Sequence, residues 1–295
     1  MTTATKTKTK TESKAEPFVK WVGGKRQMLD QYEEFFPENY NTYHEPMVGG
    51  GAVFFHLQPE KSIINDKNKI LVILYEAIRD NVDEIINQLK DLKKKHSKEF
   101  YHETLRPNFN EIKTNYLETP KDEIPKEDKI ELSANFIYLN KTCFNGLYRV
   151  NQSGEFNVPC GKYKNPTICD EENLRNVNKV LQGTKVYCED FRDIAEKVEK
   201  NDFVYIDPPY DPISDTSDFT GYTSDGFGKK DQEDLADTFR KLSERGAKVM
   251  LSNSNTDFIN DLYSDFNIHG MQANRYVNSD SDKRGKIKEV LITNY

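Results

Sequence analysis

The chain has 295 residues, of which 36% are hydrophobic and 31% are charged, and its formal net charge is −7. This length suits one large domain, or a core with an inserted subdomain, and the aromatic content of 12% is too high for a disordered chain. The longest apolar run, residues 70–75, is far shorter than the roughly 20 residues of a spanning helix, which excludes an integral membrane protein.

Residues 1–16 alternate Thr with Lys and are poor in apolar side chains, which predicts a disordered basic arm without a signal peptide. The four cysteines, at positions 143, 160, 169 and 188, form no C-x-x-C pair. We therefore expect neither a zinc ribbon nor a disulfide framework, and we assign no metal. A reducing, cytoplasmic compartment is the expected location.

Short apolar runs with strand character alternate along the chain with helical stretches. Residues 71–95 and 231–245 have helical periodicity, and the strand-like runs are residues 62–66, 185–188, 203–207, 248–252 and 290–293. Nearly continuous apolar strands that alternate with helices are typical of a parallel sheet covered on both faces. The sequence therefore predicts an α/β fold with a mostly parallel sheet.

The middle of the chain has a different character. From about residue 81 to 140 it is rich in Lys and Glu and mostly helical, and the Asn-Gly and Ser-Gly turns of residues 141–169 resemble a β-hairpin. We predict that residues 81–180 are a subdomain inserted into a core made of residues 17–80 and 181–295. The polar residues 211–229 follow a strand, so we expect them to form a mobile loop over the site.

Three segments carry an excess of Lys and Arg although the whole chain is acidic: residues 1–16, 141–164 and 275–288. Basic segments on an acidic body are typical of a protein that contacts a polyanion locally. Chance clustering on solvated loops is an equally simple interpretation of charge alone.

The glycine-rich segment 45–52 precedes a strand that ends at Asp66. Glycines after a first strand let the backbone approach a nucleotide-like ligand, and an acidic residue after the next strand can accept both ribose hydroxyls. Phe54 stands where a dinucleotide fingerprint has its third Gly, so a cofactor without a pyrophosphate is as compatible as NAD. Taken alone, this motif is equally consistent with a structural loop.

Residues 20–25 contain a second glycine turn. An ATP-binding P-loop would need Gly at position 19 and Ser or Thr at position 26, where the sequence has Val19 and Arg26. The simplest interpretation is a plain turn. In the functional interpretation, Lys25 neutralises a ligand carboxylate and Lys20 faces a phosphate or a guanine edge.

The most specific motif is Asp207-Pro208-Pro209-Tyr210, which ends the strand at 203–207. Two successive prolines remove two backbone N–H groups and fix φ, which leaves the Pro208 carbonyl rigid and outside the sheet. A carboxylate, a carbonyl and an aromatic face suit an exocyclic amine on a flat heterocycle. Two acceptors draw the amine toward tetrahedral geometry, so that its lone pair points at an electrophile. The alternative is a strand-ending turn in which Asp207 caps and Tyr210 packs.

These motifs resemble the Dam-type DNA adenine-N6 methyltransferases, a D12-class family that uses S-adenosylmethionine (SAM). Segments 20–25, 45–51, 190–191 and 207–210 are similar to its N-terminal motif, SAM loop, adenine-binding pair and catalytic tetrapeptide. Segments 140–149 and 154–159 resemble the target-recognition hairpin of the GATC-reading branch. The order of these motifs is the family's α arrangement, and Met47 replaces a usual aromatic residue. The resemblance implies a Rossmann-like methyltransferase fold that acts on double-stranded DNA, yields S-adenosylhomocysteine and needs no metal.

The resemblance also implies a role for each matching residue. Lys25 would meet the SAM carboxylate, Asp66 would hold the ribose, and Asp190 would bind the cofactor adenine. The full cofactor-binding set is Trp21, Lys25, Glu45, Gly49, Gly51, Asp66, Asp190, Phe191 and Asp207. The catalytic set is Asp207, Pro208, Pro209 and Tyr210, in which Asp207 and the Pro208 carbonyl take the N6 hydrogens of a flipped adenine and Tyr210 stacks on it.

For DNA, the family match makes Lys20 and Arg149 the residues that read guanines, while Leu147 and Pro159 touch a thymine methyl. Phe144 would fill the gap left by the flipped base, with Asn145 beside it. Phosphate contacts are expected from Arg275, Lys283 and Arg284. Ordinary hairpin packing and a solvated loop are the competing interpretations.

Two alternatives remain open in the sequence. One is a SAM enzyme for RNA adenine, DNA cytosine-N4 or a protein glutamine, although Asp at position 207 disfavours cytosine and glutamine by family pattern. The other is a catalytically silent DNA-binding module. Our prediction is adenine methylation within GATC, in restriction-modification or in Dam-like marking. A cognate restriction endonuclease is a possible functional partner, and the enzyme would be bacterial, archaeal or phage-encoded and nucleoid-associated.

Overall fold

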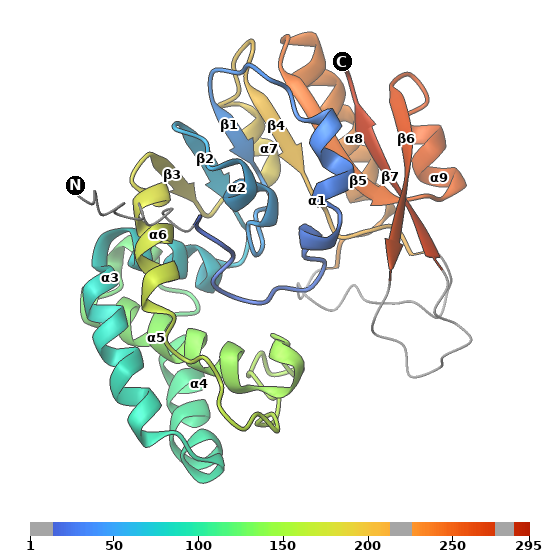
Figure 1. The fold of residues 1–295 in the computed structure, drawn as a ribbon. Coiled ribbons are helices and arrows are strands. Elements are labelled where there is room, and N and C mark those ends of the chain that lie inside the picture. Colours follow the sequence, from blue (N-terminus) through green and yellow to red (C-terminus); the bar gives the residue numbers. More distant parts are fainter. Residues whose placement is uncertain (1–13, 213–225, 275–285) are drawn as a thin grey trace, which may run out of the picture.

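The structure is a computed structural model, and it describes residues 14–212, 226–274 and 286–295. Within these residues, a seven-stranded sheet has the order β3-β2-β1-β4-β5-β7-β6 (Figure 1). The first five strands run parallel, and β7 runs antiparallel to both β5 and β6. The strands are β1 (Tyr43–Glu45), β2 (Ser62–Asn65), β3 (Thr184–Tyr187), β4 (Phe203–Ile206), β5 (Lys248–Ser254), β6 (Asn267–Asn274) and β7 (Lys286–Thr293).

Helices cover both faces of this sheet, as the alternation of side chains in β4 shows. Phe203 and Tyr205 enter one core with α1 (Leu29–Tyr32) and α2 (Ala52–Leu57). Val204 and Ile206 enter the opposite core, which is closed by α7 (Phe191–Ala195), α8 (Lys229–Glu244) and α9 (Asp257–Leu262). Successive side chains of a strand point to opposite faces, so an uninterrupted apolar run is buried on both. The predicted α/β fold is confirmed.

The long helix α3 (Lys69–Lys95) leads out of the sheet domain. Its first turn is capped by Asn68, whose side chain accepts hydrogen bonds from the N–H groups of Ile70 and Leu71. A non-helical residue, Asn81, kinks the helix at the boundary proposed for the inserted subdomain. The apolar run before the kink is almost completely buried, so this half of α3 joins the two parts of the molecule.

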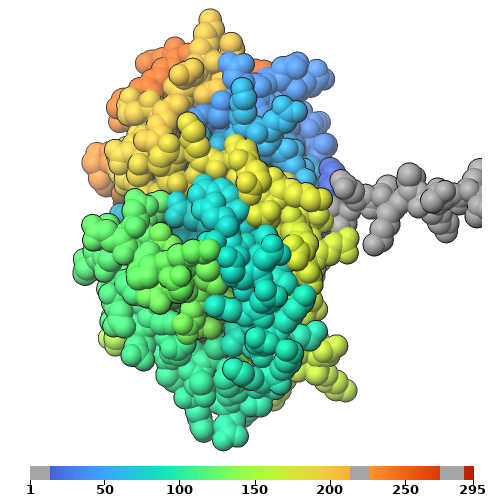
Figure 2. Space-filling view, turned by 90° about the vertical axis from the view of Figure 1, so that its left-hand side faces the viewer, coloured from blue at the N-terminus to red at the C-terminus, as the bar shows by residue number. Residues whose placement is uncertain are grey.

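Helix α3 packs against α5 (Lys126–Thr142) and α6 (Glu171–Leu181), and α4 (Arg106–Asn115) packs against α5, so that these helices form a lobe beside the sheet (Figure 1). A π-helical turn (Phe100–Leu105) precedes α4. The orthogonal view in Figure 2 shows this lobe, cyan to green, below the sheet domain. The assignment of residues 81–180 to an inserted subdomain stays a prediction.

The expected hairpin is an antiparallel loop without regular strands. It closes with isolated bridges between Cys143 and Cys160 and between Val150 and Phe156. The backbone N–H of Asn151 donates to the carbonyl of Glu155 at 2.9 Å and forms the tip. All four cysteines are free.

The described body of the protein begins before residue 17. Ala15 is buried, and the backbone N–H of Glu16 donates to Asn173 at 2.8 Å, although both residues were assigned to the basic arm. Residues 1–13 of that arm and residues 213–225 of the expected loop lie outside the described residues. No helix in the described part of the chain is both long and apolar enough to cross a membrane.

Candidate active site

The motifs selected from the sequence meet at one edge of the sheet. From β1 the chain continues to β2 on one side, and from β4 it continues to β5 on the other, so the strand order reverses between β1 and β4. Ligands of open α/β sheets bind outside the carboxyl ends of the strands at such a switch point. The glycine segment follows β1, Asp66 follows β2, and Asp207 follows β4. The fold thus brings these predicted groups together.

Two residues of the glycine turn have backbone conformations that favour glycine: φ is +50° at Gly49 and +67° at Gly51. A Cβ at Gly49 would lie 2.9 Å from the Trp21 ring, and a Cβ at Gly51 would lie 2.8 Å from the Tyr75 hydroxyl. The Gly49 N–H donates to Asp66 Oδ2 at 2.9 Å, and Tyr75 donates to the Gly49 carbonyl at 3.0 Å. The turn is therefore packed on both sides and leaves its backbone close to Asp66.

Negative charge accumulates around this turn. Glu45 is only 2% exposed; it accepts a hydrogen bond from the Tyr43 hydroxyl at 2.6 Å and another from the Phe54 N–H. Burial raises the pKa of Glu45 well above its usual value, and the nearby carboxylates of Asp207 and Asp66 raise it further. Burial also raises the pKa of Asp66. Because neither Glu45 nor Asp66 forms an ion pair with any described residue, the site fits a ligand that carries positive charge.

The Asp207 carboxylate is bound by two protein donors. Lys25 Nζ lies 2.8 Å from Asp207 Oδ1, and the Ser252 hydroxyl donates to the same oxygen at 2.9 Å. Lys25 is 5% exposed, donates to the Gly23 carbonyl at 2.6 Å, and lies 4.5 Å from the centroid of the Tyr210 ring. The carboxylate and the aromatic ring of the predicted catalytic motif thus both contact the Lys25 ammonium group.

The remaining groups of the tetrapeptide are fixed from neighbouring elements. Tyr210 donates to Glu289 Oε2 at 2.9 Å, and its pKa is raised well above the usual value by burial and by the charge of Asp207. The Pro209 carbonyl accepts from Gln232 Nε2 at 2.8 Å. The Pro208 carbonyl accepts no hydrogen bond from any described residue. Its predicted role as an acceptor for a ligand stays a prediction.

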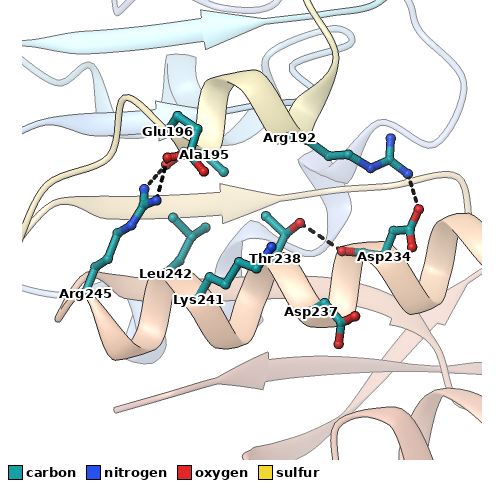
Figure 3. A pocket seen from close by; sticks show the side chains of 9 residues that line it. All are labelled: Arg192, Ala195, Glu196, Asp234, Asp237, Thr238, Lys241, Leu242 and Arg245. Carbon is teal, nitrogen blue, oxygen red and sulfur yellow. Dashed lines mark hydrogen bonds and ion pairs between the residues drawn. The ribbon is translucent and has the colours of Figure 1, made fainter.

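The predicted adenine-binding pair lies at the start of α7. Asp190 caps this helix by accepting from the Arg192 N–H at 3.1 Å, and the Arg192 guanidinium lies 4.4 Å from the centroid of the Phe191 ring. Beside Arg192, a cavity of about 220 Å³ is lined by residues of α7 and α8 (Figure 3). Two ion pairs line it, Arg192 with Asp234 and Arg245 with Glu196, both at 2.6 Å. None of the predicted site residues lines this cavity.

The predicted DNA-reading residues lie on an exposed loop after α5. Phe144 is 52% exposed, Asn145 has a φ of +57°, and the Pro159 carbonyl accepts from the Phe144 N–H at 2.9 Å. Leu147 is half-buried. Arg149 is exposed, and its Nε donates to Asn157 Oδ1 at 3.0 Å. The loop therefore presents an aromatic ring and an oriented guanidinium to solvent.

Lys20 is tied to this loop through Asn140. The Asn140 amide accepts from the Lys20 N–H at 2.8 Å and donates to the carbonyls of Lys20 and Gly146 at 2.9 and 3.1 Å. This clamp explains how a residue near the N-terminus joins a surface made 120 residues later. The three basic residues Arg275, Lys283 and Arg284 lie outside the described residues.

One important contact was not anticipated from the sequence. Trp21 lies against the glycine turn and is stacked on Tyr148, with ring centroids 5.5 Å apart and planes 16° apart. Tyr148 stacks in turn on Phe156 at 5.8 Å. Aromatic composition alone gives no signal for such a pair, because its members are far apart in sequence. Trp21 thus connects the predicted cofactor turn to the predicted recognition loop.

Among the described residues, no cluster of His, Cys, Asp and Glu could hold a metal ion. The fold and the site together are those of an α/β enzyme with a Rossmann-like cofactor site and a separate helical lobe. The donor set fits SAM, because its sulfonium and ammonium are positive and its ribose carries two hydroxyls.

Comparison with known proteins identifies the family. The model of the D12 class N6 adenine-specific DNA methyltransferases matches residues 21–277. The type II methyltransferase M.MjaIII of Methanocaldococcus jannaschii is 46% identical over 298 residues, which cover 95% of this chain and 99% of that protein. M1.LlaDCHI of Lactococcus lactis subsp. cremoris is 42% identical over 281 residues, 95% of each chain. The DNA adenine methylase of Escherichia coli is 32% identical over 278 residues, covering 94% of this chain and 95% of that protein.

The chain therefore belongs to the D12 class of N6 adenine-specific DNA methyltransferases. It is an enzyme that uses SAM to methylate adenine in DNA. The resemblance inferred from the sequence, the predicted reaction and the predicted cofactor are confirmed at this level.

Proposed function

We propose that the chain methylates the adenine of GATC, and that the residues gathered at the switch point perform the reaction. The observation that carries this proposal is the meeting of Asp207, the Tyr210 ring and the Pro208 carbonyl, which accepts no hydrogen bond from a described residue, beside the glycine turn. Two acceptors and a stacking face are what an adenine N6 group requires when the base leaves the duplex.

In the cofactor half of the site, the carboxylates of buried Glu45 and half-buried Asp66 provide the recognition. Asp66 binds the ribose hydroxyls, and Glu45 stabilises the positive charge at the methionine end. Asp190 binds the cofactor adenine, with Phe191 against it, and Trp21 covers the turn formed by Gly49 and Gly51. When bound, SAM supplies the activated methyl group.

In the catalytic half, Asp207 and the Pro208 carbonyl accept the two N6 hydrogens, while Pro209 holds the backbone rigid. Tyr210 stacks on the flipped base. The Lys25 ammonium contacts both the Asp207 carboxylate and the face of the Tyr210 ring. The flipped base can therefore bind between these two groups only after the ammonium has moved. The methionine carboxylate is the partner that we assign to the displaced Lys25. Positioning and electrostatics then carry most of the catalysis.

For sequence recognition, Arg149 and Lys20 read guanines, and Leu147 and Pro159 contact a thymine methyl. Phe144 inserts where the base has left, with Asn145 beside it, and Arg275, Lys283 and Arg284 contact phosphates. The solvent exposure of Phe144 and Arg149 supports these roles, since both can reach a duplex without unfolding the loop.

A plasmid assay tests the target sequence. Purified protein with SAM should make the plasmid resistant to a nuclease that cuts only unmethylated GATC, and sensitive to one that cuts only methylated GATC. Unchanged cutting by both, together with methyl transfer to the same plasmid, would refute GATC while leaving adenine methylation intact.

The type II names of two relatives support a further part of this proposal, namely pairing with a cognate restriction endonuclease in a restriction-modification system. Marking of the genome without a nuclease, as in Dam-like methylation, is the alternative within the same chemistry. Either role places the enzyme on DNA in the cytoplasm, at the nucleoid.

We expect Glu45→Gln to stabilise the ligand-free protein at pH 7.5 while weakening cofactor binding. A carboxyl whose pKa is raised by folding adds stability below its unfolded pKa of about 4.5, and this stability is lost as pH rises toward the folded pKa. Gln keeps an acceptor for Tyr43 and Phe54 but does not ionise. The Tm should rise by roughly 2–4 °C at pH 7.5, a gain that disappears near pH 4.5. Affinity for S-adenosylhomocysteine should fall by about tenfold because a charged contact is lost.

Thermal unfolding between pH 4.5 and 8 and calorimetric titration measure both effects. Glu60→Gln is the matched control, because Glu60 is exposed, and it should change neither quantity. An equal Tm change at both ends of the pH range would contradict the assignment to Glu45 ionisation.

A further inference from the structure

Two buried hydroxyl groups, of Ser252 and Tyr205, are hydrogen-bonded in a row behind the Asp207 carboxylate. Ser252 lies on β5, next to β4, and the register pairs Tyr205 with Met250 and Ile206 with Leu251. Asp207, the residue after Ile206, therefore lies opposite Ser252. The Ser252 hydroxyl is 2.9 Å from Asp207 Oδ1, and the Tyr205 hydroxyl is 3.1 Å from Ser252 Oγ. Ser252 is 0% exposed and Tyr205 is 1% exposed.

The direction of these hydrogen bonds follows from the chemistry of the groups. An ionised carboxylate can only accept hydrogen bonds, so the Ser252 O–H donates a hydrogen bond to Asp207. The Ser252 oxygen in turn accepts a hydrogen bond from the Tyr205 O–H. Burial and the charge of Asp207 raise the pKa of Tyr205 well above its usual value, so this phenol stays protonated and remains a donor. Such a chain polarises each of its members toward the carboxylate.

These hydrogen bonds also distinguish the two carboxylate oxygens of Asp207. Both Ser252 and Lys25 bind Oδ1, and Oδ2 accepts no hydrogen bond from any described residue. Lys25 is the contact that must move when the base enters. Ser252 is buried in the sheet and stays, so it alone continues to fix the rotation of the carboxylate.

We propose that Ser252, supported by Tyr205, is a positioning residue that holds Oδ1 of Asp207 and presents Oδ2 to the N6 group of the target adenine. This inference rests on the proposed role of Asp207. It adds a residue of β5, outside the tetrapeptide 207–210, to the groups that support the reaction. Ser252 touches neither substrate nor cofactor in this scheme and acts only through Asp207.

The test is single-turnover methyl transfer from tritiated SAM to a duplex that wild-type protein methylates. Ser252→Ala should lower the rate by about 10–100-fold, the usual effect of removing one preorganised hydrogen bond at a reacting centre. Ser252→Thr, which keeps the hydroxyl on a strand, should restore the rate to within about threefold of wild type. Tyr205→Phe should lower it by about 3–10-fold, the loss of one neutral hydrogen bond.

Two readouts separate positioning from a structural role. The Kd values for S-adenosylhomocysteine and for the duplex should stay within about twofold of wild type, since only the transition state is affected. The double variant Ser252→Ala/Tyr205→Phe should be no slower than Ser252→Ala, because both changes break the same chain of hydrogen bonds.

A rate for Ser252→Ala within twofold of wild type, or a loss that Thr does not restore, would overturn the proposal. Asp207→Asn distinguishes the two levels: if it is fully active, the proposed function fails, and if only Ser252→Ala is fully active, the positioning role fails alone.

Discussion

Replacing Asp207 with Asn is expected to lower the rate of methyl transfer by about 10³-fold, at the upper end of the effect of one preorganised electrostatic contact. The amide has nearly the volume of the carboxylate but lacks its charge. During transfer the N6 nitrogen becomes positive, and a carboxylate that accepts one of its hydrogens stabilises that charge. An amide oxygen accepts more weakly, and its NH₂ group repels the N6 hydrogens if it faces them.

Tritium transfer from SAM to duplex DNA in a single turnover measures this loss. The matched control is Asp237→Asn, because Asp237 is an exposed carboxylate on α8, and its rate should stay within twofold of wild type. Circular dichroism shows whether both variants are folded. A rate for Asp207→Asn within tenfold of wild type would contradict the catalytic role, whatever the DNA sequence that the enzyme prefers.

The sequence predicts those elements whose signal is local. Buried parallel strands have nearly continuous apolar runs, and β2, β3, β4, β5 and β7 all lie at the predicted places. The two remaining strands show why others are missed. β1 has only three residues, one of which is the charged Glu45, and β6 contains Asn, His, Gly and Gln at the edge of the sheet. Pairing with a neighbour, rather than the pattern within the strand, makes these segments extended.

In the candidate site, too, the sequence predicts only those residues that have a local signal. Asp66 and Asp207 are predictable because each ends a recognisable strand, and the ends of parallel strands share one edge of the sheet. The pairing of Lys25 with Asp207, the support from Ser252 and the stack of Trp21 on Tyr148 join residues that are distant in sequence. A single sequence contains no signal for such contacts, because the three-dimensional fold determines them.

Arg149→Ala is expected to reduce the specificity of the enzyme more than its chemistry. A bidentate contact between Arg and a guanine contributes about 1–3 kcal/mol of discrimination, so kcat/KM on a GATC duplex should fall by about 10–100-fold. On a duplex in which that G·C pair is replaced by A·T, the variant and the wild type should differ little. The two duplexes should then be methylated at more similar rates, because the variant no longer distinguishes them.

The control for this prediction is Lys162→Ala, since Lys162 is also exposed and belongs to the same basic segment. A lysine that contacts only phosphate should weaken methylation of both duplexes alike and reduce the salt slope by about 1. If Arg149→Ala also affected both duplexes equally, Arg149 would be a phosphate contact and not a base reader. We expect base reading because Asn157 accepts from Nε and thereby orients the planar guanidinium, while its two terminal NH₂ groups, which bind no described residue, can pair with the two acceptors of a guanine edge.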